Sequence, residues 1–129
     1  MQNVLQARYG KRLPENLVIK KTKEMRNIQD LGYSLELLKL EMMDGTTVFI
    51  VHAFNFKIGC SVEYSKMEDA LELWNLILLY RLHISEWYLN AKNETEKVIG
   101  SSIYSQTTGS WFDHGKKIDA FEPTLITVL

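Results

Sequence analysis

The sequence predicts an α+β fold, in which an antiparallel sheet of about five or six strands packs on one long central helix over residues 66–92. Two observations predict this arrangement. Strand-like segments follow one another on both sides of a single long helical stretch, which is the element order of an α+β protein. Between two apolar segments stands Asp44-Gly45, a pair that suits a tight hairpin turn because both residues tolerate positive φ.

Length and composition predict one domain over residues 1–129. An apolar content of 46% and a charged content of 24% are typical of folded chains and argue against disorder. The lone cysteine, Cys60, cannot form an internal disulfide, which favours a cytoplasmic location. The longest apolar stretch, residues 71–89, is interrupted by polar and charged side chains, so no membrane span is expected.

The charge distribution is uneven along the chain. Residues 1–26 contain seven basic and two acidic residues, a net charge of +5, whereas the remainder carries −6. Residues 1–13 therefore form a basic N-terminal arm, and the sequence leaves both an ordered and a flexible arm open. Residues 17–28 alternate in a way that suits a lysine-rich edge strand, with a weak helix as the alternative.

The hairpin strands are predicted over residues 33–43 and 46–57. In the first strand the apolar phase shifts after Leu37, and a bulge near Leu37–Leu38 would bring both sets of side chains to one face. The second strand is apolar on both faces around residues 48–51, which is typical of a central strand. Another strand-like segment, residues 57–64, follows.

The helix over residues 66–92 is expected to begin with a capping box formed by Ser65 and Glu68. Its polar residues make one narrow stripe, and its apolar band is about twice as wide as packing on one sheet requires. Either other segments wrap around this helix, or part of it is an interface.

The C-terminal third is predicted to return to the sheet. Residues 98–106 form a strand, residues 107–110 a turn, and residues 111–112 a returning strand. A polar loop over residues 113–117 and a short terminal strand over residues 124–129 complete the chain.

Protein binding is the function that the sequence favours. The acidic part of the helix stripe could dock on a basic partner, and aromatic residues near predicted turns are the type that dominates interface energy. The candidate protein-binding residues are Glu68, Glu72, Glu86, Tyr88, Tyr104, Trp111 and Phe112. Each aromatic residue could equally close the core, and homodimerisation through the helix would fit the same pattern.

Nucleic-acid binding is the alternative. Tyr9 lies among cations in the basic segment, where an aromatic ring can stack on a base while the cations hold phosphates. The residues concerned are Arg8, Tyr9, Lys11, Arg12, Lys20, Lys21, Lys23 and Arg26. A solvated arm beside a lysine-protected strand is the simpler interpretation, since the acidic remainder of the chain would repel a polyanion.

Catalysis has little support in the sequence. His83 and Glu86 are three residues apart and could present two metal ligands on one helix face, with His52, Asp113 or His114 completing a hydrolase site. The simpler interpretation is that these residues are solvated or hydrogen-bonded within the fold. Clustered glycines for phosphate binding and a nucleophile elbow are both absent from the sequence.

We therefore expect a small non-catalytic cytoplasmic protein that needs no cofactor or metal and binds another protein. Inhibitors, adaptors and regulatory modules fit this description, as do immunity or anti-defence factors of mobile elements, by analogy of class alone.

Overall fold

The computed structural model describes the backbone of residues 9, 18–28, 31–55, 58–94, 96–105, 110–113, 116–118 and 127–128, and side chains at 9, 28, 31–55, 59–94 and 96–103. The strands are β1 (Val18–Ile28), β2 (Tyr33–Glu41), β3 (Thr47–Phe54), β4 (Ile58–Tyr64), β5 (Val98–Ser105), β6 (Ser110–Asp113), β7 (Lys116–Ile118) and β8 (Thr127–Val128). The helices are α2 (Met67–Tyr80) and α3 (Ile84–Lys92). An α+β fold is therefore confirmed.

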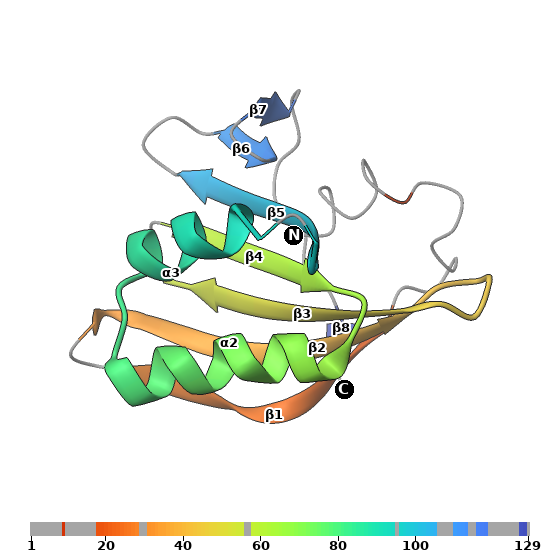
Figure 1. Ribbon diagram of the computed structural model, residues 1–129, viewed down its shortest axis with the longest axis horizontal. Helices are drawn as coiled ribbons and strands as arrows, with labels where there is room; N and C mark the ends of the chain where they lie inside the picture. Colours follow the sequence, from red (N-terminus) through yellow and green to blue (C-terminus); the bar gives the residue numbers. More distant parts are fainter. Residues whose placement is uncertain are drawn as a thin grey trace.

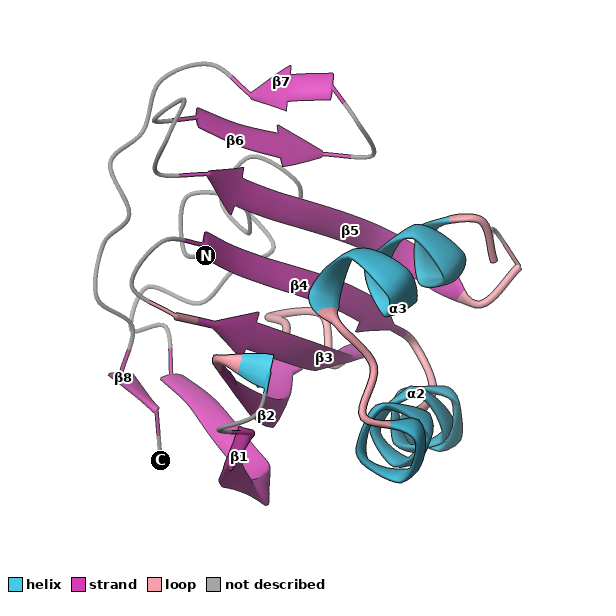
Figure 2. Cartoon of the chain, turned by 90° about the vertical axis from the view of Figure 1, so that its left-hand side faces the viewer, coloured by secondary structure: helices cyan, strands magenta, loops and turns pink. Residues whose placement is uncertain are grey.

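The described strands form one sheet in the order β7-β6-β5-β4-β3-β2-β1-β8 (Figure 1). Neighbouring strands are antiparallel except β1 and β8, which are parallel. The long strands β2 to β5 form its antiparallel centre. Figure 2 shows that both helices lie on the same face of this sheet. The expectation of five or six strands on one long helix was wrong, because the short strands at both ends of the sheet extend it and the helix is divided in two.

The predicted helix over residues 66–92 is interrupted between Tyr80 and Ile84. Arg81 adopts a left-handed conformation with φ 50°, and its backbone N–H donates to the carbonyl of Ile77, which ends α2. His83 then caps α3. A left-handed C-cap is a common helix ending, but it usually occurs at glycine or asparagine, so an arginine there gave no sequence signal.

The two helix starts also differ from the prediction. Lys66 is the N-cap of α2 and makes no side-chain capping hydrogen bond, so the capping box predicted at Ser65 and Glu68 was wrong. A capping box is present at the start of α3 instead, where the His83 backbone N–H donates to Glu86 Oε1 at 3.1 Å. The predicted box fails because α2 begins at Met67, so Lys66 and not Ser65 occupies the N-cap position.

The hairpin predicted at Asp44-Gly45 is confirmed. Gly45 has φ 86°, a value that glycine adopts without steric cost. The Asp44 carboxylate accepts hydrogen bonds from the Thr46 backbone N–H at 3.0 Å and from the Thr46 hydroxyl at 2.6 Å. These local bonds fix the turn and set the register of β2 against β3 from Glu41 opposite Thr47 to Ser34 opposite Phe54.

The bulge expected near Leu37–Leu38 in β2 was also wrong, since β2 pairs with β3 in unbroken register there. The register shifts lie in β1, between Lys21 and Lys23 and between Lys23 and Arg26. The apolar phase shift in β2 arises because this strand is buried on both faces. Leu37 packs in the core beneath the helices, whereas Leu38 is equally buried on the opposite face.

The core beneath the helices contains side chains from β2, β3, β4 and both helices. Its largest members are Trp74 and Trp87, at 4% and 1% exposure, packed with Ile77 and with Tyr64 of β4. Burial of such side chains stabilises the fold by roughly 1.5–3 kcal/mol each. The opposite face has an apolar strip at Leu38, Leu40, Val48 and Ile50, all at most 3% exposed.

The remaining strand predictions are mixed. Residues 18–28 form a strand, as favoured, but only Val18 and Ile19 pair with β8, and β8 rather than β1 is the outermost strand on that side. The strands at 98–106 and 111–112 and the terminal strand are present as β5, β6 and β8. The loop expected over residues 113–117 is partly wrong, because β7 begins at Lys116. The arm over residues 1–13 lies outside the described residues except at Tyr9.

Burial raises the pKa of three core groups. It raises the pKa of the Cys60 thiol well above its usual value. The pKa of Tyr33 is also raised, mainly by burial. The pKa of Tyr64 is raised first by burial and then by the negative charges of Glu94, Asp69 and Glu72.

These shifts predict alkaline destabilisation. Each group holds its proton more tightly in the folded protein than in the unfolded chain, so its stabilising contribution is complete below the ordinary pKa values of about 9 for cysteine and 10 for tyrosine. That contribution is lost as pH rises above these values. Urea unfolding at pH 7 to 11 should show a free energy of unfolding that declines above pH 9, and less so in Cys60→Ala. A constant value up to pH 11 would contradict this expectation.

A second prediction concerns the helix break. The Tyr33 hydroxyl donates to the backbone carbonyl of Leu82 inside the break. Tyr33→Phe removes this bond and should lower the free energy of unfolding by about 0.5–1.5 kcal/mol. Tyr80→Phe, which removes a hydroxyl from a side chain that is 65% exposed, is the matched control and should have no effect. Equal stability of both variants in urea titrations would show that the bond does not hold the break.

Candidate protein-binding surface

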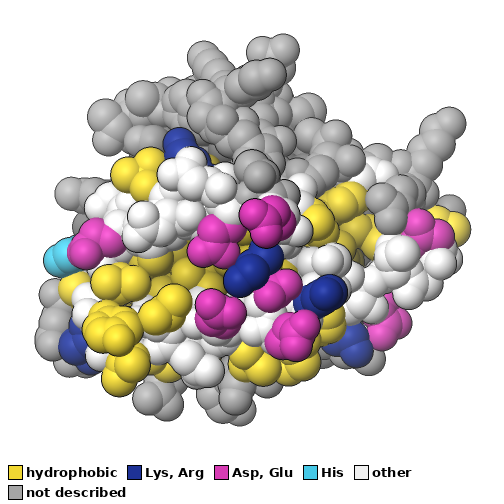
Figure 3. All heavy atoms as spheres, viewed as in Figure 1, with side chains coloured by type: hydrophobic (Ala, Val, Ile, Leu, Met, Phe, Trp, Pro, Cys, Tyr) yellow, Lys and Arg dark blue, Asp and Glu magenta, His cyan; other side chains and the backbone are white. Residues whose placement is uncertain are grey.

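Three large apolar side chains of α2 are exposed on one face of the helix. Leu76, Leu79 and Tyr80 are 39%, 72% and 65% exposed, and their spacing of three and four residues places them side by side. We call these three residues the apolar patch. Figure 3 shows hydrophobic side chains gathered where α2 ends. Contiguous exposed apolar side chains are more informative than single ones, because they mark interaction sites.

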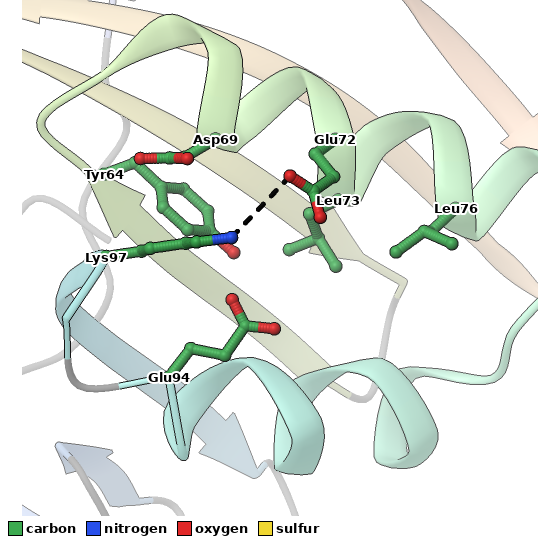
Figure 4. A pocket seen from close by; sticks show the side chains of 7 residues that line it. All are labelled: Tyr64, Asp69, Glu72, Leu73, Leu76, Glu94 and Lys97. Atoms are coloured by element: carbon green, nitrogen blue, oxygen red, sulfur yellow. Dashed lines mark ion pairs between the residues drawn. The ribbon is translucent and has the colours of Figure 1, made fainter.

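A small hollow lies beside the patch, between α2 and the turn that follows α3. The residues lining it are Tyr64, Asp69, Glu72, Leu73, Leu76, Glu94 and Lys97, and we call this set the acidic hollow (Figure 4). Its volume is about 20 Å³, which suits a group of the size of water. Because Leu76 belongs to both features, the patch and the hollow form one continuous surface along α2.

The charge of the hollow is unbalanced. Asp69, Glu72 and Glu94 contribute three negative charges, and Lys97 contributes one positive charge. The Lys97 ammonium lies 3.7 Å from Glu72 Oε2, with side chains 41% and 61% exposed. An ion pair this exposed stabilises the fold little, so Lys97 can leave its place at small cost. The remaining charge of −2 makes this surface attractive to cations.

The structure separates the acidic residues that the sequence grouped on one stripe. Glu72 lines the acidic hollow, and Glu68 is exposed in the first turn of α2. Glu86 is exposed too, but it caps α3 beyond the helix break. Asp69, Glu94 and Lys97 were missed, because their proximity depends on α3 folding back along α2.

The aromatic candidates have different outcomes. Tyr88 is 5% exposed and belongs to the core under α3, so its assignment to a binding surface was wrong. Tyr104 of β5 stands opposite Trp111 of β6, and Phe112 stands opposite Ile103. The side chains of Tyr104, Trp111 and Phe112 lie outside the described residues. Tyr80 belonged to the wide apolar band expected for the helix, and Leu79 interrupted its polar stripe, but spacing alone could not separate exposed from buried positions.

The metal candidates do not converge in the described part of the chain. His83 and Glu86 meet through the capping box of α3, which explains their spacing without a metal. Among the residues whose side chains are described, no three His, Cys, Asp or Glu residues lie close enough to hold a metal ion. His114 lies outside the described residues, and the Asp113 side chain is likewise not described.

The structure describes only part of the basic set that was considered for nucleic-acid binding. Tyr9 donates its hydroxyl hydrogen bond to Glu63, which is fully buried in β4. Lys20, Lys21, Lys23 and Arg26 lie along β1, but their side chains are not described. Arg8, Lys11 and Arg12 also lie outside the described residues. The one member of this set whose side chain is described is therefore bound to a buried carboxylate of the sheet.

A row of polar residues crosses the sheet on the face away from the helices. Glu36, His52, Ser61 and Ser102 stand opposite one another on β2 to β5. His52 Nδ1 lies 3.2 Å from Glu36 Oε2, and the hydroxyls of Ser61 and Ser102 are 2.8 Å apart. Both serines are at most 1% exposed. The row satisfies buried polar groups within the sheet, and such pairing fixes strand register.

Comparison of the chain with protein families, curated proteins and solved structures found no match. In the part of the chain that the structure describes, neither helix has the length and apolar character to span a membrane.

Proposed function

We propose that this protein is a small non-catalytic binding module that recognises another protein through the apolar patch and the acidic hollow. The partner would present a segment with apolar side chains for the patch and positive charge for the hollow. An inhibitor, adaptor or regulatory subunit would act in this way. The observation that carries the proposal is the exposure of Leu79 and Tyr80, at 72% and 65%, beside an uncompensated acidic hollow.

The energetics of interfaces support this surface. A few aromatic and large apolar anchors usually supply most of the binding energy, and the surrounding polar groups exclude water and set orientation. Leu79 and Tyr80 have the size for such anchors, and neither is needed to fill the core that Trp74 and Ile77 occupy on the buried face of α2. Removing their apolar surface from water favours a complex, and the cost of association opposes it, so buried area does not convert directly into affinity.

Electrostatics favours a basic partner over a second copy of the chain. A symmetric dimer built on this face would bring the hollows of both copies into the same interface. Both carry a net charge of −2, so they would repel. A basic segment gains attraction at the same place, and it also associates faster because the field steers it. Nucleic acid is disfavoured at this surface for the same reason.

Peptide selection tests the proposal directly. A display library of random 15-residue peptides would be selected on the immobilised protein, and a synthetic consensus peptide measured by fluorescence anisotropy. We expect a pool rich in Lys or Arg beside large apolar residues. Leu79→Asp should weaken the consensus peptide about tenfold or more, because it places a charge where an apolar anchor docks.

The matched control is Met43→Asp. Met43 is 68% exposed, but it lies in the β2–β3 turn, at the opposite end of the molecule from the end of α2 (Figure 1). This variant should bind the peptide as the wild type does. An acidic or purely polar pool would contradict the proposal, and so would a peptide that tolerates Leu79→Asp. Far-UV circular dichroism would confirm that both variants are folded.

A further inference from the structure

The outer edge of β1 is a long stretch of strand backbone that the described part of the sheet leaves uncovered. β1 has 11 residues, and within the described chain only Val18 and Ile19 pair with β8. The residues from Lys20 to Ile28 have β2 as their neighbour on one side and no described strand on the other. Figure 2 shows β1 and β8 together at one end of the sheet, away from β5 to β7. An edge of this length is a site at which a further strand can be added.

Strand pairing already takes place on this edge. In a strand, the N–H and C=O groups of successive residues point alternately to its two sides. About every second residue between positions 20 and 28 therefore directs its backbone groups away from β2. At Val18 and Ile19 the same edge is paired with Thr127 and Val128 in parallel register. The edge is thus competent for pairing, and a partner segment would extend that pairing from the point where β8 ends.

The charge of β1 argues against a second copy of the chain on this edge. The strand has four cations and one anion, a net charge of +3, from Lys20, Lys21, Lys23, Arg26 and Glu24. Pairing of β1 with β1 across a two-fold axis would bring two such strands together. Pairing of β1 with β7 of another copy is also disfavoured, because β7 contains Lys116 and Lys117. Like charges on facing strands destabilise their pairing, so the charge favours an acidic partner strand.

Two irregularities in β1 narrow the kind of strand that fits. The register against β2 shifts between Lys21 and Lys23 and again between Lys23 and Arg26. Bulges and lysines on edge strands are the devices that prevent uncontrolled pairing with flat, uncharged strands. A short acidic strand is favoured instead, because the lysines that repel other partners attract it. Nucleic acid would be attracted as well, but it has no ladder of backbone N–H and C=O groups with which to continue the sheet.

We propose that the outer edge of β1 over residues 20–28 binds a short, acidic, extended segment of a partner protein. The segment adds to the sheet as a further strand beyond β1. Its backbone pairs with the outward N–H and C=O groups of β1, and its carboxylates are attracted by the net positive charge of the strand. This site uses β1 and not α2, so it does not rest on the proposed function.

Hydrogen exchange in the protein alone tests whether the edge is open. Amide exchange rates would be measured by NMR for residues 20–28 and for β3, which is paired on both sides, by β2 and β4. We expect slow exchange throughout β3 and fast exchange at about half of the β1 amides, those that face away from β2. Slow exchange at every β1 amide would show that the edge is covered and would overturn the proposal. Fast exchange at every β1 amide would overturn it too, because β1 would then not be a stable strand.

A designed peptide distinguishes strand addition from attraction by charge alone. The probe is a capped, fluorescein-labelled peptide, Glu-Val-Glu-Thr-Glu-Val-Glu-Thr, measured by fluorescence anisotropy. Three further versions are N-methylated at the glutamates, at the other residues, or at every residue, and all keep the same charge. Because an added strand uses one of its two sides, at least one half-methylated version should bind like the parent. The fully methylated version should bind about tenfold more weakly or worse. Equal binding of all versions, or loss of binding in both half-methylated versions, would overturn the proposal.

Variants of the protein locate the peptide on β1. Reversing two charges together, by Lys21→Glu and Lys23→Glu, should weaken the acidic peptide about tenfold and favour its lysine counterpart, Lys-Val-Lys-Thr-Lys-Val-Lys-Thr. Binding of the lysine peptide would also show that this variant is folded. Lys92→Glu, a matched reversal on α3, should leave the affinity unchanged, as should Leu79→Asp in the apolar patch. Unchanged binding in the double variant would overturn the proposal. Tighter binding of an eight-nucleotide single strand of thymidines than of the acidic peptide would overturn the assignment to a protein strand.

Discussion

The left-handed turn at Arg81 is the constraint on which the arrangement of the helical layer depends. It ends α2 through the hydrogen bond from the Arg81 N–H to the Ile77 carbonyl, and Tyr33 of β2 holds the next residue through the Leu82 carbonyl. His83 then begins α3. Because the chain turns here, α3 lies on β4 and β5 instead of continuing away from the sheet, and the turn after α3 returns Glu94 and Lys97 to α2.

The same break sets what is buried and what is exposed. The face of α2 with Ala70, Trp74 and Ile77 packs on the sheet, and Trp87 of α3 closes the neighbouring part of the core. Leu76 and Leu79 are left on the outer face. The wide apolar band predicted for the helix is therefore divided in the structure: one side packs in the core, and the other side is exposed. The exposed side is the surface that we propose for a basic, apolar partner segment.

Sequence reasoning predicted the parts of the fold that local chemistry determines. The Asp44-Gly45 turn depends on two residues and their neighbours, and the lysine-rich segment over residues 18–28 alternates like the strand it forms. The helix break was missed because an arginine in a left-handed cap carries no sequence signature. The phase shift at Leu37–Leu38 was misinterpreted, because burial on both faces of β2 depends on what packs against each face.

The sequence predicted the kind of site, a protein-binding surface, but not most of the residues that form it. An acidic helix face and a surplus of apolar helix surface indicated protein binding, and Glu72 was named from that pattern. The hollow needs residues from three separated segments, at Tyr64, Asp69–Leu76 and Glu94–Lys97, and no spacing rule joins them. Tyr88 was assigned to the surface because aromatic residues serve in cores and interfaces alike, and only packing against the sheet decides between them.

Replacing Arg81 by glycine and by alanine measures the helix break most directly. Both variants lose the arginine side chain, so the difference in their free energies of unfolding reports on the backbone. In a left-handed turn, glycine avoids a steric cost of about 1–2 kcal/mol that alanine retains, and we predict that Arg81→Gly is the more stable variant. In a continuous helix the order reverses, because glycine is about 1 kcal/mol less favourable than alanine there. An Arg81→Ala variant more stable than Arg81→Gly would contradict the break.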